Sequence, residues 1–400
     1  MTIVMTGGGS GGHITPLLAV AHELKEKQPG AHLVYVGQKG DSLGDVPAQD
    51  PNIDQVYTVR AGKFRRYHGE SFLQHLIDLP TVFKNLRDAV WVIVGTWQSF
   101  WLLRRLRPDV IFVKGGFVGV PVGLSAALLR IPYVTHDSDA IPGLANRIIA
   151  RWASIHAVAL PKEVYAYPAD KTVTVGVPIS RKYHPVSAKQ QHEVRERLGL
   201  EHFGKIVLVT GGGLGAKSLN EAVVSCASEL LARYPDLAVV LIAGRGKDSA
   251  TRKQLQKELS ASDQKRIIVK DFVTNLDEYS AAADVVVTRA GGTAVAELAA
   301  QEKACIVVPH PLLAGGHQLK NARVLADRKA VRFVQEDVLT HDHRALMPAL
   351  TELLDRPERA KQLAKKLASM AHPDAASHLA MVLLEVAAKH EAPARHVQKK

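Results

Sequence analysis

The sequence predicts an α/β protein made of two Rossmann-like, doubly wound domains that face each other across a cleft. Two glycine-rich loops, at residues 7–13 and 211–216, lie at matching places in the two halves of the chain, and each directly follows a short apolar run. Such runs are typical of buried parallel strands, and the free N–H groups of the helix after each loop favour phosphate. We therefore expect both domains to handle phosphate groups.

The elements follow in the order strand, loop, helix, which is the pattern of parallel α/β sheets. The apolar runs predict strands at residues 3–5, 33–36, 110–113, 133–135, 155–158 and 173–175 in the first half, and at 206–209, 238–242, 266–269, 285–288, 305–308 and 331–334 in the second. The periodicity weakens near residues 178–204, so we place the hinge at residues 180–200.

These boundaries predict an N-terminal domain over residues 1–185 and a C-terminal domain over residues 200–372. The remaining segment, 373–400, is expected to contain a helix at 375–389 and a disordered polar tail from His390. The two cysteines, Cys226 and Cys305, lie in apolar stretches, which predicts buried packing and fits a reducing, cytoplasmic setting.

A net charge of +12 and a pI near 9.6 predict an anionic partner. Nucleic acid is disfavoured, because the sequence has no zinc-finger spacing, no RNA- or DNA-binding motif and no basic helix with stacking aromatics. Phosphorylated ligands and an acidic membrane surface remain as partners.

Aromatic and basic residues are concentrated between residues 60 and 107. Three of the four tryptophans, Trp91, Trp97 and Trp101, lie there, with Arg104 and Arg105 close behind. Such a mixture suits a membrane interface, and an ordinary buried amphipathic helix is the alternative. The longest uncharged run, 89–103, is shorter than the roughly 20 residues of a membrane span, so we expect no transmembrane helix. No secretory signal is visible, so we do not expect export by that route.

Dinucleotide binding has to be weighed, because Gly7, Gly9 and Gly12 satisfy the G-x-G-x-x-G pattern. The acidic residue that would hold a ribose at the end of the second strand is absent, since Gln38 stands there and Asp41 follows only later in a loop. Neither glycine loop ends in the Gly-Lys-Ser/Thr of a P-loop. No Asp-x-Asp pattern occurs to carry Mg²⁺ to a nucleotide-sugar. We expect no bound cofactor and no metal.

Six segments with distinctive sequences occur in order along the chain. They are residues 8–13 with Pro16, 115–117 with Pro121 and Gly123, 136–139, 212–220, 289–297 and 317–322. Together they resemble the MurG family of peptidoglycan N-acetylglucosaminyltransferases. The resemblance implies a GT-B fold and a metal-independent, inverting transfer of N-acetylglucosamine from UDP-GlcNAc to the muramoyl 4-hydroxyl of lipid I, giving lipid II.

The same resemblance implies the partners and the cellular location of such a protein. Its partners would be UDP-GlcNAc, lipid I and the anionic surface of the membrane, at whose cytoplasmic face it would be peripherally bound. The N-terminal domain would bind the acceptor and the membrane, and the C-terminal domain the UDP-sugar. Its product would serve cell-wall biogenesis.

In the first domain, the glycine loops allow backbone N–H groups to approach a diphosphate closely, and a tight strand-to-helix turn is the alternative reading. The ligand-binding candidates are Ser10, Gly11, Gly12 and Gly116. His13 lies at the mouth of the first loop, where an imidazole can accept the proton of the attacking hydroxyl. His13 is thus the first candidate for the general base, a capping or phosphate-binding histidine is the alternative, and Asp139 is the rival base.

In the second domain, Glu297 is expected to open a helix after a glycine-rich turn and to accept hydrogen bonds from both ribose hydroxyls. The resemblance implies nucleotide contacts from Gly292, Thr293 and Ala294, a uracil site bordered by Phe272 and Val273, and sugar contacts from Gln318 and His317. Arg181 and Gly213 complete the ligand-binding candidates. Helix N-termini at residues 212–213 and 291–292 would stabilise the leaving UDP, and Lys217 is a candidate cation.

The chain also departs from the family pattern. The motif usually written His-Glu-Gln-Asn is here His136-Asp137-Ser138-Asp139, so that an amide expected near the donor sugar becomes an acid. Phe117 replaces a usual tyrosine. Which donor sugar the protein selects therefore stays open. Two other functions also remain: a GT-B enzyme that glycosylates another lipid, such as diacylglycerol, and a non-catalytic module that binds lipid diphosphates.

Overall fold

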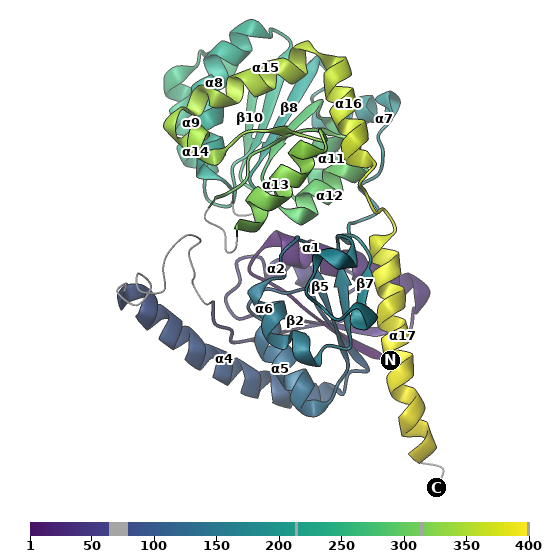
Figure 1. The fold of residues 1–400 in the computed structure, drawn as a ribbon. Coiled ribbons are helices and arrows are strands. Elements are labelled where there is room, and N and C mark those ends of the chain that lie inside the picture. Colours follow the sequence, from purple (N-terminus) through teal and green to yellow (C-terminus); the bar gives the residue numbers. More distant parts are fainter. Residues whose placement is uncertain (64–78, 213–214, 312–315, 398–400) are drawn as a thin grey trace. The chain divides into compact units, whose positions relative to one another are not determined.

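The computed structural model describes residues 1–63, 79–212, 215–311 and 316–397, and it divides the chain into two compact units (Figure 1). The first unit consists of Met1–Ser180 and His372–Lys400, and the second of Arg181–Ala371. Each unit is an open parallel sheet with helices on both faces, which confirms the predicted doubly wound α/β class.

The first unit is built on a seven-stranded parallel sheet of order β3-β2-β1-β4-β5-β6-β7. Its strands are β1 Thr2–Thr6, β2 His32–Gln38, β3 Gln55–Val59, β4 Val110–Val113, β5 Tyr133–Asp137, β6 Ile155–Val158 and β7 Thr172–Thr174. β3 was not predicted. It lies at the sheet edge, and most of its side chains are exposed, so the apolar run that marks the other strands is missing from it.

The helices of the first unit cover the two faces of this sheet. They are α1 Gly11–Lys27, α2 Asp45–Ala48, α4 Leu79–Leu106, α5 Gly119–Leu129, α6 Leu144–Ile149 and α17 Ala375–Val397, with 3₁₀ turns η1 Ala150–Trp152, η2 Lys162–Val164 and η3 Ala169–Lys171. Alternate strand residues point to opposite faces. Ile3 and Met5 pack under α1 and α17, whereas Val4 packs under α4 and α5.

The last helix, α17, is part of the first unit. Its residues Leu379 and Leu383 are fully buried in the same cluster as Leu17 and Leu24 of α1. α17 continues to Val397, past His390, where the sequence predicted a disordered tail to begin. After His390, Glu391, Ala392, Ala394 and Arg395 favour helix whereas Pro393 does not, so polarity alone was a poor reason to end the helix there.

The second unit has a six-stranded parallel sheet of order β10-β9-β8-β11-β12-β13. Its strands are β8 Lys205–Thr210, β9 Leu237–Ile242, β10 Ile267–Lys270, β11 Val285–Thr288, β12 Ala304–Val307 and β13 Arg332–Phe333. Its helices are α7 Ala188–Leu198, α8 Lys217–Arg233, α9 Asp248–Glu258, α10 Ala261–Gln264, α11 Leu276–Ala282, α12 Gly292–Ala300, α13 His317–Asp327, α14 Glu336–His341, α15 Met347–Asp355 and α16 Pro357–Ala368, with η5 His343–Leu346.

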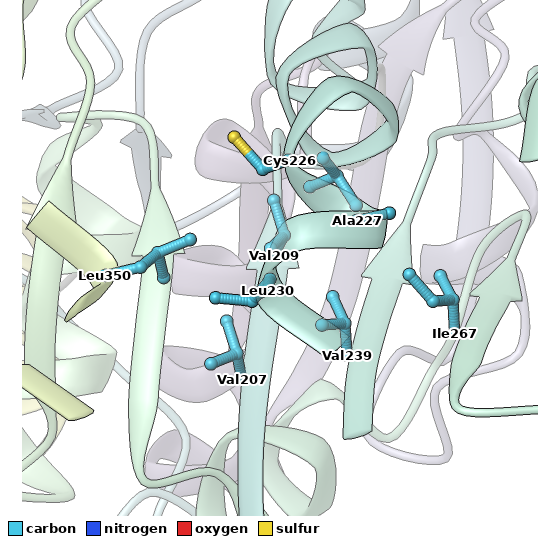
Figure 2. Close-up of a pocket in the computed structure, with 9 residues that line it drawn as sticks. Val207, Val209, Cys226, Ala227, Leu230, Val239, Ile267 and Leu350 are labelled. Atoms are coloured by element: carbon cyan, nitrogen blue, oxygen red, sulfur yellow. The ribbon is translucent and has the colours of Figure 1, made fainter. Parts of the chain in front are cut away.

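The core of the second unit is closely packed. Both cysteines are buried in it, as predicted, and burial raises the pKa of Cys226 to about 11 and that of Cys305 to about 12. A void of about 10 Å³ lies between β8, β9 and α8, lined by side chains such as Val209, Cys226 and Leu350 (Figure 2). A space of that size holds at most one water molecule, so it is a packing defect and not a ligand site.

Candidate functional site

In each sheet, the strand order reverses at one place. This place lies between β1 and β4 in the first unit and between β8 and β11 in the second. In open α/β sheets, ligands bind at the carboxyl ends of the strands beside such a point. Both predicted glycine loops follow the strands concerned, so each unit has a candidate site where the sequence placed it.

In the first unit, the loop between β1 and α1 is held by groups of the chain itself. Gly9 has a φ of 78°, and a Cβ atom there would lie 2.6 Å from the ring of Phe117. The N–H of Gly9 donates to Oδ2 of Asp41 at 2.7 Å, and the hydroxyl of Tyr35 donates to the carbonyl of Gly7. Asp41 therefore fixes the glycine loop, a role that its position beyond β2 did not reveal.

The start of α1 remains suited to an anion. The 17-residue helix has no acidic residue in its first turn to oppose its dipole, and the Asp41 carboxylate meets the chain before it, at the N–H of Gly9. Ser10 is the N-cap residue, but its hydroxyl lies 2.9 Å from Nδ1 of His13 and does not cap the backbone. Ser10 and His13 thus form a pair at the mouth of the loop.

The second glycine pair lies directly against the first loop. Gly115 and Gly116 have φ values of 108° and 74°, which favour glycine. A Cβ atom on Gly116 would lie 2.6 Å from the carbonyl oxygen of Gly8, and one on Gly115 would lie 3.7 Å from Cδ2 of His13. The structure therefore brings together the two loops and the histidine that the sequence singled out.

The four-residue motif at 136–139 divides into structural and exposed parts. His136 and Asp137 end β5 and are buried. Nε2 of His136 is 2.8 Å from the carbonyl oxygen of Gly176, and burial, with the charge of Lys114 adding, holds the pKa of His136 well below its usual value. His136 is therefore neutral in the folded protein.

Asp137 connects several segments of the first unit through hydrogen bonds. Its carboxylate accepts hydrogen bonds from the N–H of Gly143 at 3.0 Å, Nδ2 of Asn146 at 2.9 Å and the hydroxyl of Tyr167 at 2.9 Å. Desolvation nevertheless raises its pKa. Asp139, the candidate base, lies in the turn beyond, where its carbonyl oxygen accepts from the hydroxyl of Tyr165 at 3.1 Å.

In the second unit, Glu297 is buried in the second turn of α12. The helix begins at Gly292, so the prediction that Glu297 opens it was wrong. Only 8% of Glu297 is exposed, and burial, with the charge of Asp277 adding, raises its pKa to about 8. Burial likewise raises the pKa of Tyr183, with Glu297 and Asp277 contributing. A buried carboxyl group here can exchange a proton near neutral pH.

The turn before α12 is anchored by a charge cluster that sequence reasoning missed. Arg289 directly follows β11 and precedes the glycine turn. Its guanidinium forms an ion pair with Glu336 of α14. It also donates to Oγ of Ser218 at 3.0 Å and to the carbonyl of Val308 at 3.1 Å. Arg289 thereby ties α8, α14 and β12 to the glycine turn at 291–292.

Helix α13 carries the predicted sugar-contacting side chains. Oε1 of Gln318 accepts the N–H of His310 at 2.9 Å, and Nε2 lies 4.0 Å from the position of a Cβ on Gly291. Its amide oxygen is thus engaged, and its amino group is on the side of the turn. Asn321 donates to the carbonyl of Ala290 at 3.1 Å, so it holds the same loop.

The remaining candidates belong to other parts of the second unit. The guanidinium of Arg245 lies 4.4 Å above the ring of Phe272, and Val273 packs against the core. Thr293 is buried at the start of α12. Arg181 is exposed at the first residue of the second unit, and Lys217 pairs with Glu221 at 3.5 Å. Gly213 lies outside the described residues.

Among the described residues, no group of three or more His, Cys, Asp or Glu side chains is arranged to hold a metal ion. The helices that the structure describes include none that is both long and apolar enough to cross a bilayer.

One helix of the first unit has an unusual surface. α4 exposes an apolar row along one face, which we call the α4 row: Phe83, Leu86, Val90, Ile93, Trp97 and Trp101. Beside this row the helix is anchored, because Oε1 of Gln98 accepts the N–H of Arg60 at 2.9 Å and the guanidinium of Arg60 lies 3.8 Å above the Trp91 ring. Of three basic residues that precede this helix in the chain, Lys63 is described and exposed, and Arg65 and Arg66 lie outside the described residues.

Both units match models of known domains. Residues 3–158 match the N-terminal domain of glycosyltransferase family 28, and residues 206–379 match its C-terminal domain. The fold and the two glycine-loop sites therefore define a two-domain glycosyltransferase.

Relatives with assigned names narrow this class. A protein of Moorella thermoacetica is 32% identical and one of Natranaerobius thermophilus 30% identical, each over 96% of this chain and 99% of its own. Both are called UDP-N-acetylglucosamine–N-acetylmuramyl-(pentapeptide) pyrophosphoryl-undecaprenol N-acetylglucosamine transferase. The crystal structure of Acinetobacter baumannii MurG has a TM-score of 0.67 at 27% identity and covers 96% of this chain and 99% of its own. The chain belongs to the MurG family of these transferases.

Proposed function

We infer that this chain transfers N-acetylglucosamine from UDP-GlcNAc to the 4-hydroxyl of the muramoyl sugar of lipid I, giving lipid II. The observation that carries this function is the relationship to the named transferases, which extends over 96% of the chain and through both units. The chemistry of the two candidate sites agrees with it. One site offers loops for a diphosphate and a basic side chain, and the other a carboxyl group and a glycine turn for a nucleotide.

On the acceptor side, His13 acts as the general base. The imidazole lies against the Gly115–Gly116 turn, where the loops would hold the diphosphate of the acceptor. If Nδ1–H donates to Ser10, the lone pair of Nε2 is available to take the proton of the 4-hydroxyl as its oxygen attacks C1 of the sugar. Attack from the face opposite the leaving UDP inverts the anomeric centre.

On the donor side, Glu297 accepts hydrogen bonds from the two ribose hydroxyls of UDP. The backbone at Gly292, Thr293 and Ala294 lines the nucleotide, and Phe272 and Val273 border the uracil. The amino group of Gln318 donates to a sugar hydroxyl, since its oxygen is engaged by His310. The N-termini of α8 and α12 stabilise the charge on the departing UDP.

The α4 row docks the first unit on the anionic membrane surface that carries lipid I, which would make the enzyme peripheral at the cytoplasmic face. Aromatic and aliphatic side chains of the row enter the headgroup region, and Lys84, Arg87, Arg104 and Arg105 of the same helix meet the lipid phosphates. An amphipathic surface of this kind binds a membrane in two ways: its apolar side chains are transferred out of water, and its cations are attracted to the anionic lipids.

The test is transfer from radiolabelled UDP-GlcNAc to a lipid I analogue, with unlabelled UDP-glucose and UDP-GalNAc as competitors. The expected result is a labelled disaccharide product and weak competition by both other nucleotide-sugars. Measurable UDP binding without transfer from any donor would contradict the proposed function and direct the search to other acceptor lipids. Strong competition by UDP-GalNAc would show that the altered 136–139 motif changes donor selection.

A further inference from the structure

Lys114 lies where the strand order of the first sheet reverses. It directly follows β4, and its N–H donates to the carbonyl of Thr6 at 3.0 Å, which continues the pairing of β4 with β1. Gly115 and Gly116 come next, and a Cβ on Gly7 would lie 3.4 Å from the Cβ of Lys114. Only 3% of Lys114 is exposed. A cation is therefore buried at the base of both glycine loops, where neither the motifs nor the spacing pointed to one.

The surroundings of this ammonium group compensate its charge only in part. In the described part of the chain, its one hydrogen-bond acceptor is the neutral Oγ of Ser138, at 2.9 Å, although an ammonium has three donors. Burial lowers the pKa of Lys114 to about 8, against the opposing effect of Asp137 and Asp139. Burying an ammonium costs several kcal/mol unless nearby negative charge offsets the lost hydration.

The two carboxylates near Lys114 are not equivalent. Asp137 already accepts three hydrogen bonds, from Gly143, Asn146 and Tyr167, so its charge is stabilised without the lysine. Asp139 is half-buried in a turn that the Tyr165 hydroxyl holds through the backbone. It directly follows Ser138, whose hydroxyl holds the Lys114 ammonium, and its negative charge acts on Lys114.

We propose that Lys114 is a positioning residue of the acceptor site, whose ammonium balances the Asp139 carboxylate so that the acceptor diphosphate can bind at the Gly115–Gly116 turn. This inference rests on the proposed function, because it takes the diphosphate of that acceptor as the ligand. Without the ammonium, Asp139 and the diphosphate would be like charges in a poorly solvated site, and their repulsion would weaken binding.

The experiment measures a water-soluble lipid I analogue with a shortened polyprenyl chain in two ways: its Kd without UDP-GlcNAc and its KM in transfer. Lys114→Met removes the charge at similar volume and should raise both by about tenfold or more, as expected for loss of one charge interaction in a desolvated site. The KM for UDP-GlcNAc should not change. Introducing Asp139→Asn into Lys114→Met should bring the acceptor Kd back toward that of the wild type.

Two further variants separate charge balance from structural damage. Ser138→Ala removes one charge-assisted hydrogen bond but keeps both charges, so the acceptor Kd should rise clearly less than in Lys114→Met. Lys303→Met is the matched control. Lys303 is also buried, and it donates to the carbonyls of Ala281 at 2.7 Å and Ala283 at 3.0 Å in the second unit. Its loss should lower the unfolding temperature without changing the acceptor Kd.

Three results would overturn the inference: an unchanged acceptor Kd in Lys114→Met, no recovery in the double variant, or an equal loss in Ser138→Ala. The proposed function fails separately. A wild-type protein that binds the analogue but transfers nothing would refute the function and leave the Kd comparison valid. A wild-type protein that does not bind the analogue would overturn both.

Discussion

The hydroxyl of Ser10 lies 2.9 Å from Nδ1 of His13, across the first turn of α1. Of the two imidazole nitrogens, the one that faces Ser10 is thus engaged within the chain, and the tautomer decides whether Nε2 can accept a proton. A base at this position depends on Nδ1 carrying the hydrogen.

The first prediction concerns this pair. His13→Ala should lower kcat by about 10²- to 10⁴-fold, the usual range for a general base, with little change in the KM for UDP-GlcNAc. Ser10→Ala should lower kcat by a smaller factor, because the tautomer is no longer fixed, and Ser10→Thr should restore it. Single-turnover kinetics measure the chemical step directly.

Asp139→Asn is the comparison that decides between the two candidate bases. If His13 is the base, Asp139→Asn keeps most of kcat. A kcat unchanged in His13→Ala and lost in Asp139→Asn would reverse the assignment.

The second prediction concerns protons at the donor site. Burial raises the pKa of unliganded Glu297 to about 8, so the group is mostly protonated at pH 7. Two ribose hydroxyls donating to the carboxylate favour its charged form, so UDP binding should release up to about one proton per site near pH 7. Below pH 8, UDP affinity should fall as the pH falls, by up to about tenfold per unit, because the proton must first leave.

Calorimetry of UDP binding in buffers of different ionisation enthalpy measures this release. Glu297→Gln should abolish it and raise the KM for UDP-GlcNAc by about tenfold or more, as expected for the loss of a charged hydrogen-bond acceptor. Asp277→Asn removes the negative charge that raises the pKa of Glu297, so it should reduce the release at pH 7. Equal release in the wild type and in Glu297→Gln would assign the proton to another group.

The third prediction concerns the buried pair of Arg289 and Glu336. Glu336→Gln leaves the guanidinium without its carboxylate, which should destabilise the second unit by about 3 kcal/mol and raise the KM for UDP-GlcNAc as the glycine turn loosens. Glu352→Gln, which breaks the more exposed pairs with Arg332 and Arg359, is the control and should cost less than about 1 kcal/mol. Denaturant unfolding of both variants tests the difference.

The fourth prediction concerns the α4 row. Replacing Ile93 and Trp97 together by glutamine should reduce partition to phosphatidylglycerol vesicles by about tenfold or more, since each large apolar side chain contributes up to about 1.5–3 kcal/mol when buried. Added salt should weaken the remaining binding. Glutamine at Val324 and Val338, which are 39% and 48% exposed on the second unit, is the control and should have no effect. An equal loss of vesicle binding in the control would show that any exposed apolar side chain contributes and that the α4 row has no special role.

Much of this architecture could be predicted, because the signals were local. Buried strands such as β4 and β11 are continuous apolar runs, and the glycine loops at 7–12 and 115–116 need backbone conformations that glycine alone adopts easily. The edge strand β3 lacks the apolar run, and α12 begins earlier, at Gly292, and α17 ends later, at Val397, than the sequence patterns indicated.

The parts of the sites that sequence reasoning missed are set by tertiary structure. Asp41 and Lys114 belong to none of the segments that were singled out, Arg289 begins segment 289–297 but was given no role there, and each of the three acts on a residue far away in the chain. Gly9 lies 32 positions from Asp41, and Glu336 lies 47 positions from Arg289. A buried lysine next to a glycine pair could have been noticed as unusual, but its counter-charges were visible only after folding.

The return of α17 to the first unit has a consequence for biosynthesis. The hydrophobic cluster that closes over Ile3 and Leu17 includes Leu379 and Leu383, so the earliest-made part of the chain needs one of the latest-made parts to complete its core. On the ribosome, the second unit has a continuous sequence and can fold as it emerges. The first must wait with an uncovered apolar face until α17 leaves the exit tunnel.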